Sequence, residues 1–291
     1  MKRNKPSFIS DLFELAKVRI TIAVTITTTA GYVIFHHGFS PDMIWPVVGL
    51  FLTACGSAVI NQIQERKKDA LMERTKERPL SSGRISYRFA VTYAFTLSFS
   101  GLWMLWQSSG FIPMALAALA LIWYNLIYTN LKKVTAFAVV PGSVIGSIPP
   151  AVGWTAAGGS LADPALWYLC FFFFIWQVPH FWLLLLKYGK QYEQAGFPSL
   201  TGIYTDFQLK KITFIWAVAM AVSGMALVFT GLSSGLFAKT GLIFLSLLII
   251  FLFSKLVLKK YAQESLKKYF IVINFYMLSV VALLMIDTVW N

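Results

Sequence analysis

The chain has 291 residues, of which 57% are hydrophobic and 16% aromatic, and its mean hydropathy is +0.67. This composition excludes an ordinary soluble domain, because such domains are only about half apolar. The net charge of +13 could indicate a nucleic-acid-binding protein, but the positions of the basic residues, described below, argue against that class.

The N-terminal residues 7–18 have apolar side chains at helical spacing, which is typical of a helix lying in the membrane interface. After them come apolar runs near the ~20 residues that a helix needs to cross a bilayer. We therefore predict an all-α, polytopic membrane protein, a single membrane-embedded domain over residues 1–291 with nine transmembrane helices around a cavity open to the cytoplasmic side. The nine expected spans are 20–36, 43–63, 89–107, 111–129, 134–154, 165–186, 212–232, 237–256 and 269–289.

The basic residues lie almost entirely on one side of these spans. Of the 25 lysines and arginines, 24 fall in the N-terminal segment and the even-numbered loops, and Lys239 alone falls on the other side. The positive-inside rule then places the N-terminus and these loops in the cytoplasm and the C-terminus outside. The charge is thus explained by topology and by contact with a lipid bilayer, and we expect no nucleic-acid partner.

A polar stretch, "NQIQERKKDALMERTKERPL" at residues 61–80, follows directly on the second apolar run. Asn61, Glu65 and Asp69 are four residues apart, so on a helix they share one face. Carboxylate and amide oxygens suit Mg²⁺, which is often held by one or two carboxylates together with substrate phosphate. The basic residues just beyond them could bind that phosphate: Arg74, Lys76 and Arg78. For Glu73 and Glu77 a solvated helix face is the simpler interpretation.

This stretch resembles the first signature of the protoheme IX farnesyltransferases, or heme O synthases, a branch of the UbiA-type intramembrane prenyltransferases. The resemblance covers nearly the whole chain, since "KVRIT" at 17–21, "YTNLKKVTAFAVVPGSVIGSIPPAVGWTAAGG" at 128–159 and "WQVPHFWLLLLKYGKQYEQAGFPSL" at 176–200 also agree. The positions matching the first signature are Asn61, Glu65, Asp69, Met72, Arg74, Thr75, Arg78, Pro79 and Leu80.

The resemblance implies transfer of a farnesyl group from farnesyl diphosphate to a vinyl group of heme B, with addition of water, in a bacterial inner membrane. It implies Mg²⁺-diphosphate on Asn61, Glu65 and Asp69, and possible association with other heme or terminal-oxidase biogenesis proteins. Candidates for diphosphate or propionate oxygens, or for the cavity wall, are Arg74, Lys76, Arg78, Lys132, Lys133, Lys17, Arg19, Asn125 and Tyr192. For Lys17, Arg19, Lys132 and Lys133, simple anchoring at the cytoplasmic face is the alternative.

His180 lies in the sixth expected span, directly after Pro179. Its functional interpretations are contact with heme or proton handling at the vinyl group. The structural alternative is a histidine that is hydrogen-bonded between packed helices.

Val18 stands where the family has proline in its K-P-R-I-T stretch, and one further departure from the family pattern bears on the metal site. Gln191 stands directly before Tyr192, where the family usually has aspartate. Glu193 is a candidate replacement as a metal ligand, but two residues along a helix it would point to the opposite side. Glu193 could substitute only if this segment is irregular.

Two other functions remain open from the sequence. One is a sister prenyltransferase that acts on an aromatic quinone precursor, which would share the first signature and the topology. The other is a non-catalytic heme transport or assembly protein, which would keep a cavity but need no metal.

The distribution of basic residues leads to a test of topology. We expect reporter fusions after Thr75 and after Leu200 to report the cytoplasm, and a fusion after Ser160 to report the opposite side. A fusion after Thr75 that reports the outside would contradict the predicted position of the polar stretch.

Overall fold

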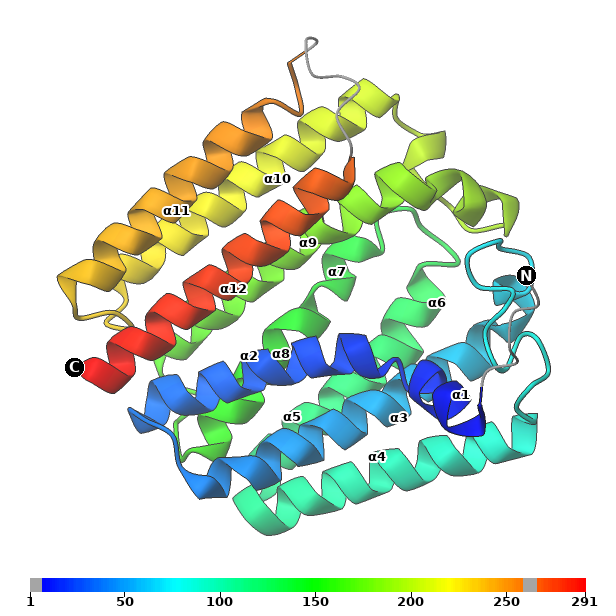
Figure 1. Ribbon diagram of the computed structural model, residues 1–291, viewed down its shortest axis with the longest axis horizontal. Helices are drawn as coiled ribbons and strands as arrows, with labels where there is room; N and C mark the ends of the chain where they lie inside the picture. The colour runs from blue at the N-terminus through cyan, green and yellow to red at the C-terminus, as the bar shows by residue number, and fades with distance from the viewer. Residues whose placement is uncertain (1–6, 259–265) are drawn as a thin grey trace.

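The computed structural model describes residues 7–258 and 266–291, and within these ranges every regular element is helical (Figure 1). The all-α prediction is therefore confirmed. Five of the basic residues counted toward the topology lie outside the described residues: Lys2, Arg3, Lys5, Lys259 and Lys260.

The helices follow the predicted order closely. They are α1 (Phe8–Leu15), α2 (Val18–His36), η1 (Pro41–Met43), α3 (Ile44–Asp69), α4 (Tyr87–Ser109), α5 (Phe111–Ile122), η2 (Trp123–Tyr128), α6 (Thr129–Leu131), α7 (Val139–Gly142), α8 (Val144–Ala156), α9 (Pro164–Gln194), η3 (Leu200–Gly202), α10 (Asp206–Ala226), η4 (Leu227–Phe229), α11 (Leu236–Ser254) and α12 (Leu266–Trp290). Among the described residues, eight helical segments are long and apolar enough to cross a membrane.

Several helices begin at polar caps that the sequence supplies. Ser7, Ser86 and Asp163 each accept a hydrogen bond from a backbone N–H in the first turn of α1, α4 and α9. Thr205 and Gln208 form a reciprocal capping box at the start of α10. These contacts satisfy amide donors that a helix cannot pair internally, and they fix where the helices start.

The expected span 134–154 differs from the prediction, because it is divided into the short α7 and the longer α8. Pro141 and Gly142 end α7, and Pro149 and Pro150 lie inside α8. Proline has no N–H to donate and its ring crowds the preceding turn, so a continuous helix is disfavoured here. The preceding span is also irregular, since η2 is a π-helical turn between α5 and α6.

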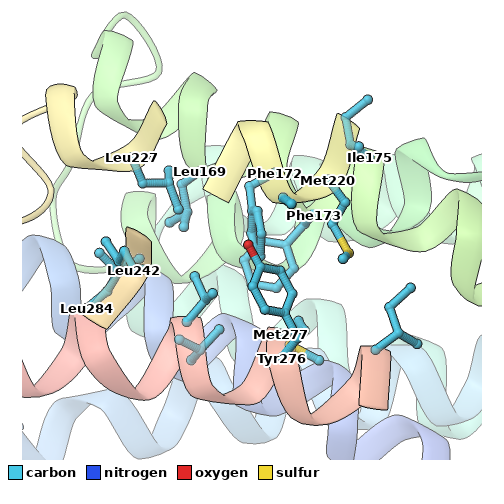
Figure 2. Close-up of a cluster of buried hydrophobic side chains, with 14 of the residues drawn as sticks. Leu169, Phe172, Phe173, Ile175, Met220, Leu227, Leu242, Tyr276, Met277 and Leu284 are labelled. Atoms are coloured by element: carbon cyan, nitrogen blue, oxygen red, sulfur yellow. The ribbon is translucent and has the colours of Figure 1, made fainter. Parts of the chain in front are cut away.

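The main apolar core lies between α9 and the C-terminal helices. Phe172 and Phe173 of α9 are fully buried and pack with Met220 of α10 and Tyr276 of α12 (Figure 2). The hydroxyl groups of Tyr276 and Ser246 lie 2.8 Å apart, so a polar pair is satisfied inside this core.

Helices α2 and α8, and helices α3 and α4, approach each other closely where glycine residues face the neighbouring backbone. A side chain at Gly31 of α2 would overlap the carbonyl oxygen of Pro150 in α8, and one at Gly101 of α4 would overlap Thr53 of α3. Such close approach is typical of helices that associate in a membrane. In Figure 1 the loops that follow α3 and α9 lie together at one end of the helices, and this end carries the candidate site.

Candidate active site

Three buried oxygen-bearing side chains line one face at the end of α3. Helix α3 continues beyond the expected span 43–63 to Asp69, so Asn61, Glu65 and Asp69 are all helical, as their spacing predicted. Their exposed fractions are only 1%, 6% and 1%, whereas Glu73 and Glu77 lie beyond the helix and are exposed. We call Asn61, Glu65 and Asp69 the oxygen row.

Each member of the oxygen row contacts one basic side chain from another segment. Lys17 Nζ donates to Asn61 Oδ1 at 2.8 Å. Lys132 Nζ lies 2.5 Å from Glu65 Oε1, and Arg78 Nη1 donates to Asp69 Oδ2 at 2.6 Å. Buried carboxylates need such partners, because an isolated charge is very costly away from water.

Lys17 reaches the oxygen row through an unusual backbone conformation. It lies between α1 and α2 in the left-handed region, with φ 50° and ψ 42°, which is uncommon for a residue other than glycine. Burial, together with the positive charges of Arg78 and Lys132, lowers the pKa of Lys17 to about 7. The cluster is therefore crowded with positive charge, and a bound anion would relieve that repulsion.

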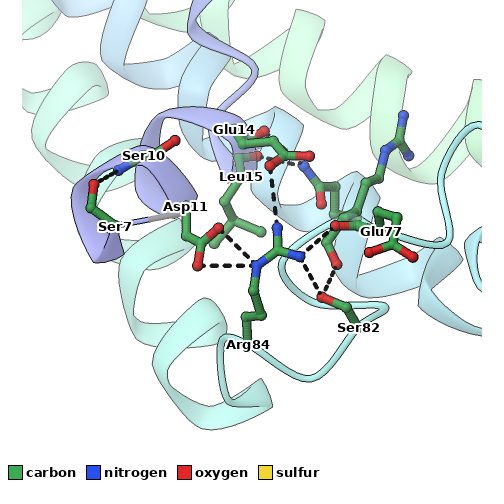
Figure 3. A network of polar contacts seen from close by, with 10 residues as sticks. Ser7, Ser10, Asp11, Glu14, Leu15, Glu77, Ser82 and Arg84 are labelled. Carbon is green, nitrogen blue, oxygen red and sulfur yellow. Dashed lines mark hydrogen bonds and ion pairs between the residues drawn. The ribbon is translucent and has the colours of Figure 1, made fainter. Parts of the chain in front are cut away.

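Helix α1 is tied to the site by Arg84, which lies in the loop between α3 and α4 (Figure 3). Arg84 Nε donates to both carboxylate oxygens of Asp11, at 3.0 and 3.2 Å, and Nη1 donates to the Glu77 carbonyl oxygen at 2.7 Å. From α3, Gln62 Nε2 donates to the carbonyl oxygens of Glu14 and Leu15 at 3.1 and 2.9 Å. These contacts hold the end of α1, and so hold Lys17, against the oxygen row.

The last turns of α9 and the segment that follows them also come to the end of α3. Arg74 Nη2 donates to the Tyr192 hydroxyl at 2.9 Å. Lys68 Nζ donates to the Gly196 carbonyl oxygen at 2.9 Å and lies 3.8 Å from the centre of the Phe197 ring. The two polar loops, more than a hundred residues apart in sequence, thus form one surface.

Glu193 does not join the oxygen row in this structure. Helix α9 runs without interruption through Gln194, so residues 191 and 193 point differently, and the Glu193 carboxylate accepts a hydrogen bond from Thr201 Oγ1 at 2.6 Å. Within residues 7–258 and 266–291, no three side chains of histidine, cysteine, aspartate or glutamate are grouped to hold a metal ion. The donor set of the row is therefore two carboxylates and one amide.

Three other basic candidates, Lys133, Lys76 and Arg19, are exposed. Lys133 Nζ donates to Asn130 Oδ1 at 3.1 Å, Lys76 pairs with exposed Glu73 at 2.7 Å, and Arg19 is exposed on α2. Lys133 and Glu65 both line a pocket of about 350 Å³ together with Ile63, Gln64, Arg66, Lys67 and Lys68.

An aromatic path leads from the site toward His180. Tyr124 and Tyr128 stack at 5.8 Å between ring centres, and Lys132 Nζ lies 5.4 Å from the Tyr128 ring. Tyr128 is 6.4 Å from Phe181, whose ring is 5.6 Å from that of His180. His180 also lies 4.8 Å from the rings of Trp176 and Phe270, and its buried Nδ1 accepts or donates no hydrogen bond among the described residues.

Asn125 is buried in the π-helical turn, on the side that faces α3. Its Nδ2 donates to Ser57 Oγ at 2.6 Å and to the Leu121 carbonyl oxygen at 3.0 Å. Sequence reasoning singled out Asn125 but missed Gln62 and Thr129, which contact α1 and Asn61. The sequence could have indicated Gln62, because a second polar amide side chain directly after Asn61, at the end of an apolar run, is unusual in a membrane helix.

The fold and the site together define a multi-pass helical membrane protein with a buried row of oxygen ligands faced by three cations. The UbiA prenyltransferase family model matches residues 24–280. The chain is 34% identical to a protoheme IX farnesyltransferase of Aquifex aeolicus, over 90% of each chain. It is 35% identical to proteins of the same name from Geobacter sulfurreducens, over 75% of this chain and 80% of the relative, and from Oleidesulfovibrio alaskensis, over 72% and 74%.

Solved structures share the fold at low sequence identity. A digeranylgeranylglyceryl phosphate synthase superposes with a TM-score of 0.76 at 17% identity, over 97% of this chain and 99% of that one. A UbiA homologue from Archaeoglobus fulgidus bound to GPP and Mg²⁺ gives 0.67 at 13% identity, over 94% and 99%. The chain belongs to the UbiA prenyltransferase family.

The attachment of α1 leads to a test of stability. We expect Arg84→Met to leave the buried Asp11 carboxylate without its cation and to loosen α1 by about 1–3 kcal/mol, which is less than for a fully buried pair because a quarter of the Arg84 side chain is exposed. Hydrogen exchange of residues 8–17 should accelerate. The control is Lys76→Gln, which removes an exposed ion pair with Glu73. Equal exchange rates of residues 8–17 in both variants would show that the Arg84–Asp11 pair does not hold α1 in place.

Proposed function

We propose that this chain transfers a farnesyl group from farnesyl diphosphate to a vinyl group of heme B, with addition of water, to form heme O. The observation that carries the proposal is the oxygen row with its three cations, which has the composition that a metal-bound diphosphate requires. The choice of farnesyl donor and heme acceptor is supported by the names of the relatives that are 34–35% identical over most of the chain.

The oxygen row fits Mg²⁺ by its chemistry. It offers hard oxygen donors only, two of them carboxylates, all held on one face of a rigid helix and almost fully buried. In this proposal Asn61, Glu65 and Asp69 hold Mg²⁺, which would neutralise charge that develops on the departing diphosphate. Glu193 would become a further ligand only if its side chain left Thr201.

Lys17, Arg78 and Lys132 bind the diphosphate in this proposal. Their charged groups already converge on the oxygen row from three different segments, and positive groups fixed in a site of low polarity stabilise a developing anion without having to reorganise. Arg74, placed beside Tyr192, and the more exposed Lys76, Lys133 and Arg19 would bind outer oxygens, including the propionates of heme.

The aromatic side chains keep water from the reacting allylic group. Tyr124, Tyr128 and Phe181 form a continuous wall from Lys132 inward, and their ring faces can stabilise a cation. Beyond them, His180 has a hydrogen bond to the Asn274 side chain of α12 and one ring nitrogen, Nδ1, without a hydrogen bond among the described residues. We assign to His180 contact with heme or proton transfer at the vinyl group, and to Asn125 a place in the cavity wall.

The proposal includes an orientation and a setting. The whole chain acts as one membrane-embedded domain over residues 1–291 in a bacterial inner membrane, with the oxygen row at the cytoplasmic side and the C-terminus outside. This side carries nearly all basic residues. Association with other heme or terminal-oxidase biogenesis proteins would deliver heme B and receive heme O.

The acceptor is tested with the reconstituted chain and labelled farnesyl diphosphate. We expect label to appear in heme O when heme B is the acceptor. When an aromatic quinone precursor replaces heme B, we expect no labelled product. Pigment analysis after expression in a bacterial host that lacks heme O gives the same information in a membrane. Label transferred to the aromatic acceptor alone would contradict the heme assignment, and Mg²⁺-independent binding of heme without diphosphate release would indicate a carrier.

The oxygen row is tested by removing one charge from it. We expect Asp69→Asn to lower turnover at least ~10²-fold, the lower range for the loss of one electrostatic stabiliser. Glu73→Gln is the control, because Glu73 has the same spacing in sequence but is exposed beyond the helix, and its turnover should fall far less. Steady-state transfer rates at saturating Mg²⁺ provide the measurement, and equal losses would show that Asp69 has no special role.

A further inference from the structure

Thr129 is the first residue of α6 and directly follows the π-helical turn. Its backbone N–H bonds the carbonyl oxygen of Tyr124, five residues earlier, and its Oγ1 donates to the same oxygen at 2.8 Å. Thr129 is completely buried. A hydroxyl group has one proton to donate, so with that proton on Tyr124 the Thr129 oxygen can only accept.

Asn61 supplies the hydrogen bond that Thr129 accepts. Its Nδ2 lies 3.2 Å from Thr129 Oγ1, and its Oδ1 accepts from Lys17 Nζ at 2.8 Å. The two ends of an amide are alike in shape and opposite in hydrogen-bonding character, so neighbouring groups decide which end faces which side. With Nδ2 committed to Thr129, the oxygen of Asn61 faces the cation side of the oxygen row.

We propose that Thr129 is a positioning residue, which fixes the Asn61 amide with its oxygen toward the metal and so makes an amide serve as the third ligand of the oxygen row. The proposal rests on the proposed function, in that Mg²⁺ is the cation that Asn61 holds. If the amide were reversed, its two N–H groups would face the metal, and a ligand would become a repulsive group.

The π-helical turn makes this contact possible. A regular helix would have given the Tyr124 carbonyl oxygen to residue 128, whereas the π-helical turn gives it to Thr129. The turn is itself held by α3, because Gln64 Nε2 donates to the Asn125 carbonyl oxygen at 3.1 Å and Asn125 donates to Ser57. Ser57, Asn61 and Gln64 thus set the position of the turn against the helix that carries the oxygen row, and π-helical turns are frequent at functional sites.

The first test measures metal affinity directly. Mn²⁺ is titrated into the purified full-length protein in detergent, and free Mn²⁺ is followed by electron paramagnetic resonance. We expect Thr129→Val, which keeps the shape and removes the hydroxyl, to weaken Mn²⁺ binding ~10- to 100-fold, as is usual when a partner of a metal ligand is lost. Thr129→Ser, which keeps the hydroxyl, should restore affinity to within about threefold of the original protein.

A matched control is Thr213→Val. Thr213 is also fully buried, and its hydroxyl donates to the Leu209 carbonyl oxygen at 2.8 Å, but it lies on α10 away from the oxygen row. We expect this variant to bind Mn²⁺ as the original protein does. If Thr129→Val does not fold, as judged by its thermal unfolding, Thr129→Cys takes its place, because a thiol is a poor acceptor.

A double-mutant cycle separates positioning from a general effect on the fold. In an Asn61→Asp background both oxygens of residue 61 are equivalent, so its orientation no longer matters, and Thr129→Val should then weaken Mn²⁺ binding by less than about threefold. The same loss in both backgrounds, or no rescue by Thr129→Ser, would overturn the proposal. Because Mn²⁺ binding needs no acceptor, failure of heme farnesylation alone would sink the proposed function and leave this inference standing.

Discussion

The ion pairs of the oxygen row are the constraint on which the rest of the site depends. Two carboxylates and an amide are buried at the end of a membrane helix, and such charges persist only when they are paired. Their partners come from the start of α2, from the loop after α3 and from the end of α6. The start of α2 and the end of α6, both distant from α3 in sequence, must therefore meet α3 and the loop that follows it, and the N-terminal half of the fold is arranged to bring them there.

Several irregular parts of the backbone lie near the same point, although His37, at the other end of α2, is also left-handed. Lys17 adopts a left-handed conformation between α1 and α2, the π-helical turn delivers Thr129 and Lys132, and the fifth span is broken at Gly142, where a side chain would collide with Tyr128. Strained or irregular backbone persists where surrounding contacts hold it. Here Gln62, Arg84 and the hydrogen bond from Trp123 Nε1 to the Pro141 carbonyl oxygen provide them.

The sequence predicted the helices well because membrane spans depend on local hydropathy, and it failed at span 134–154, where prolines and glycines divide an apolar run. The oxygen row followed from helical spacing. Its partners did not, because Lys17 and Arg19, or Lys132 and Lys133, look equivalent in sequence, whereas only Lys17 and Lys132 turn inward. Gln62, Arg84 and Thr129 were missed because they act through contacts with residues 47 to 73 positions away, which no local pattern reveals.

The charge balance of the site explains why a metal and a diphosphate would enter it together. Glu65 and Asp69 carry two negative charges, and Lys17, Arg78 and Lys132 satisfy them along with Asn61. A diphosphate alone would draw these cations away and leave buried carboxylates unpaired, which is costly. A divalent cation alone would satisfy the carboxylates and leave the basic groups unpaired. The pair replaces both sets of partners, so the network of internal ion pairs favours tighter binding of a metal-bound diphosphate than of either component, and a divalent cation alone binds with lower affinity.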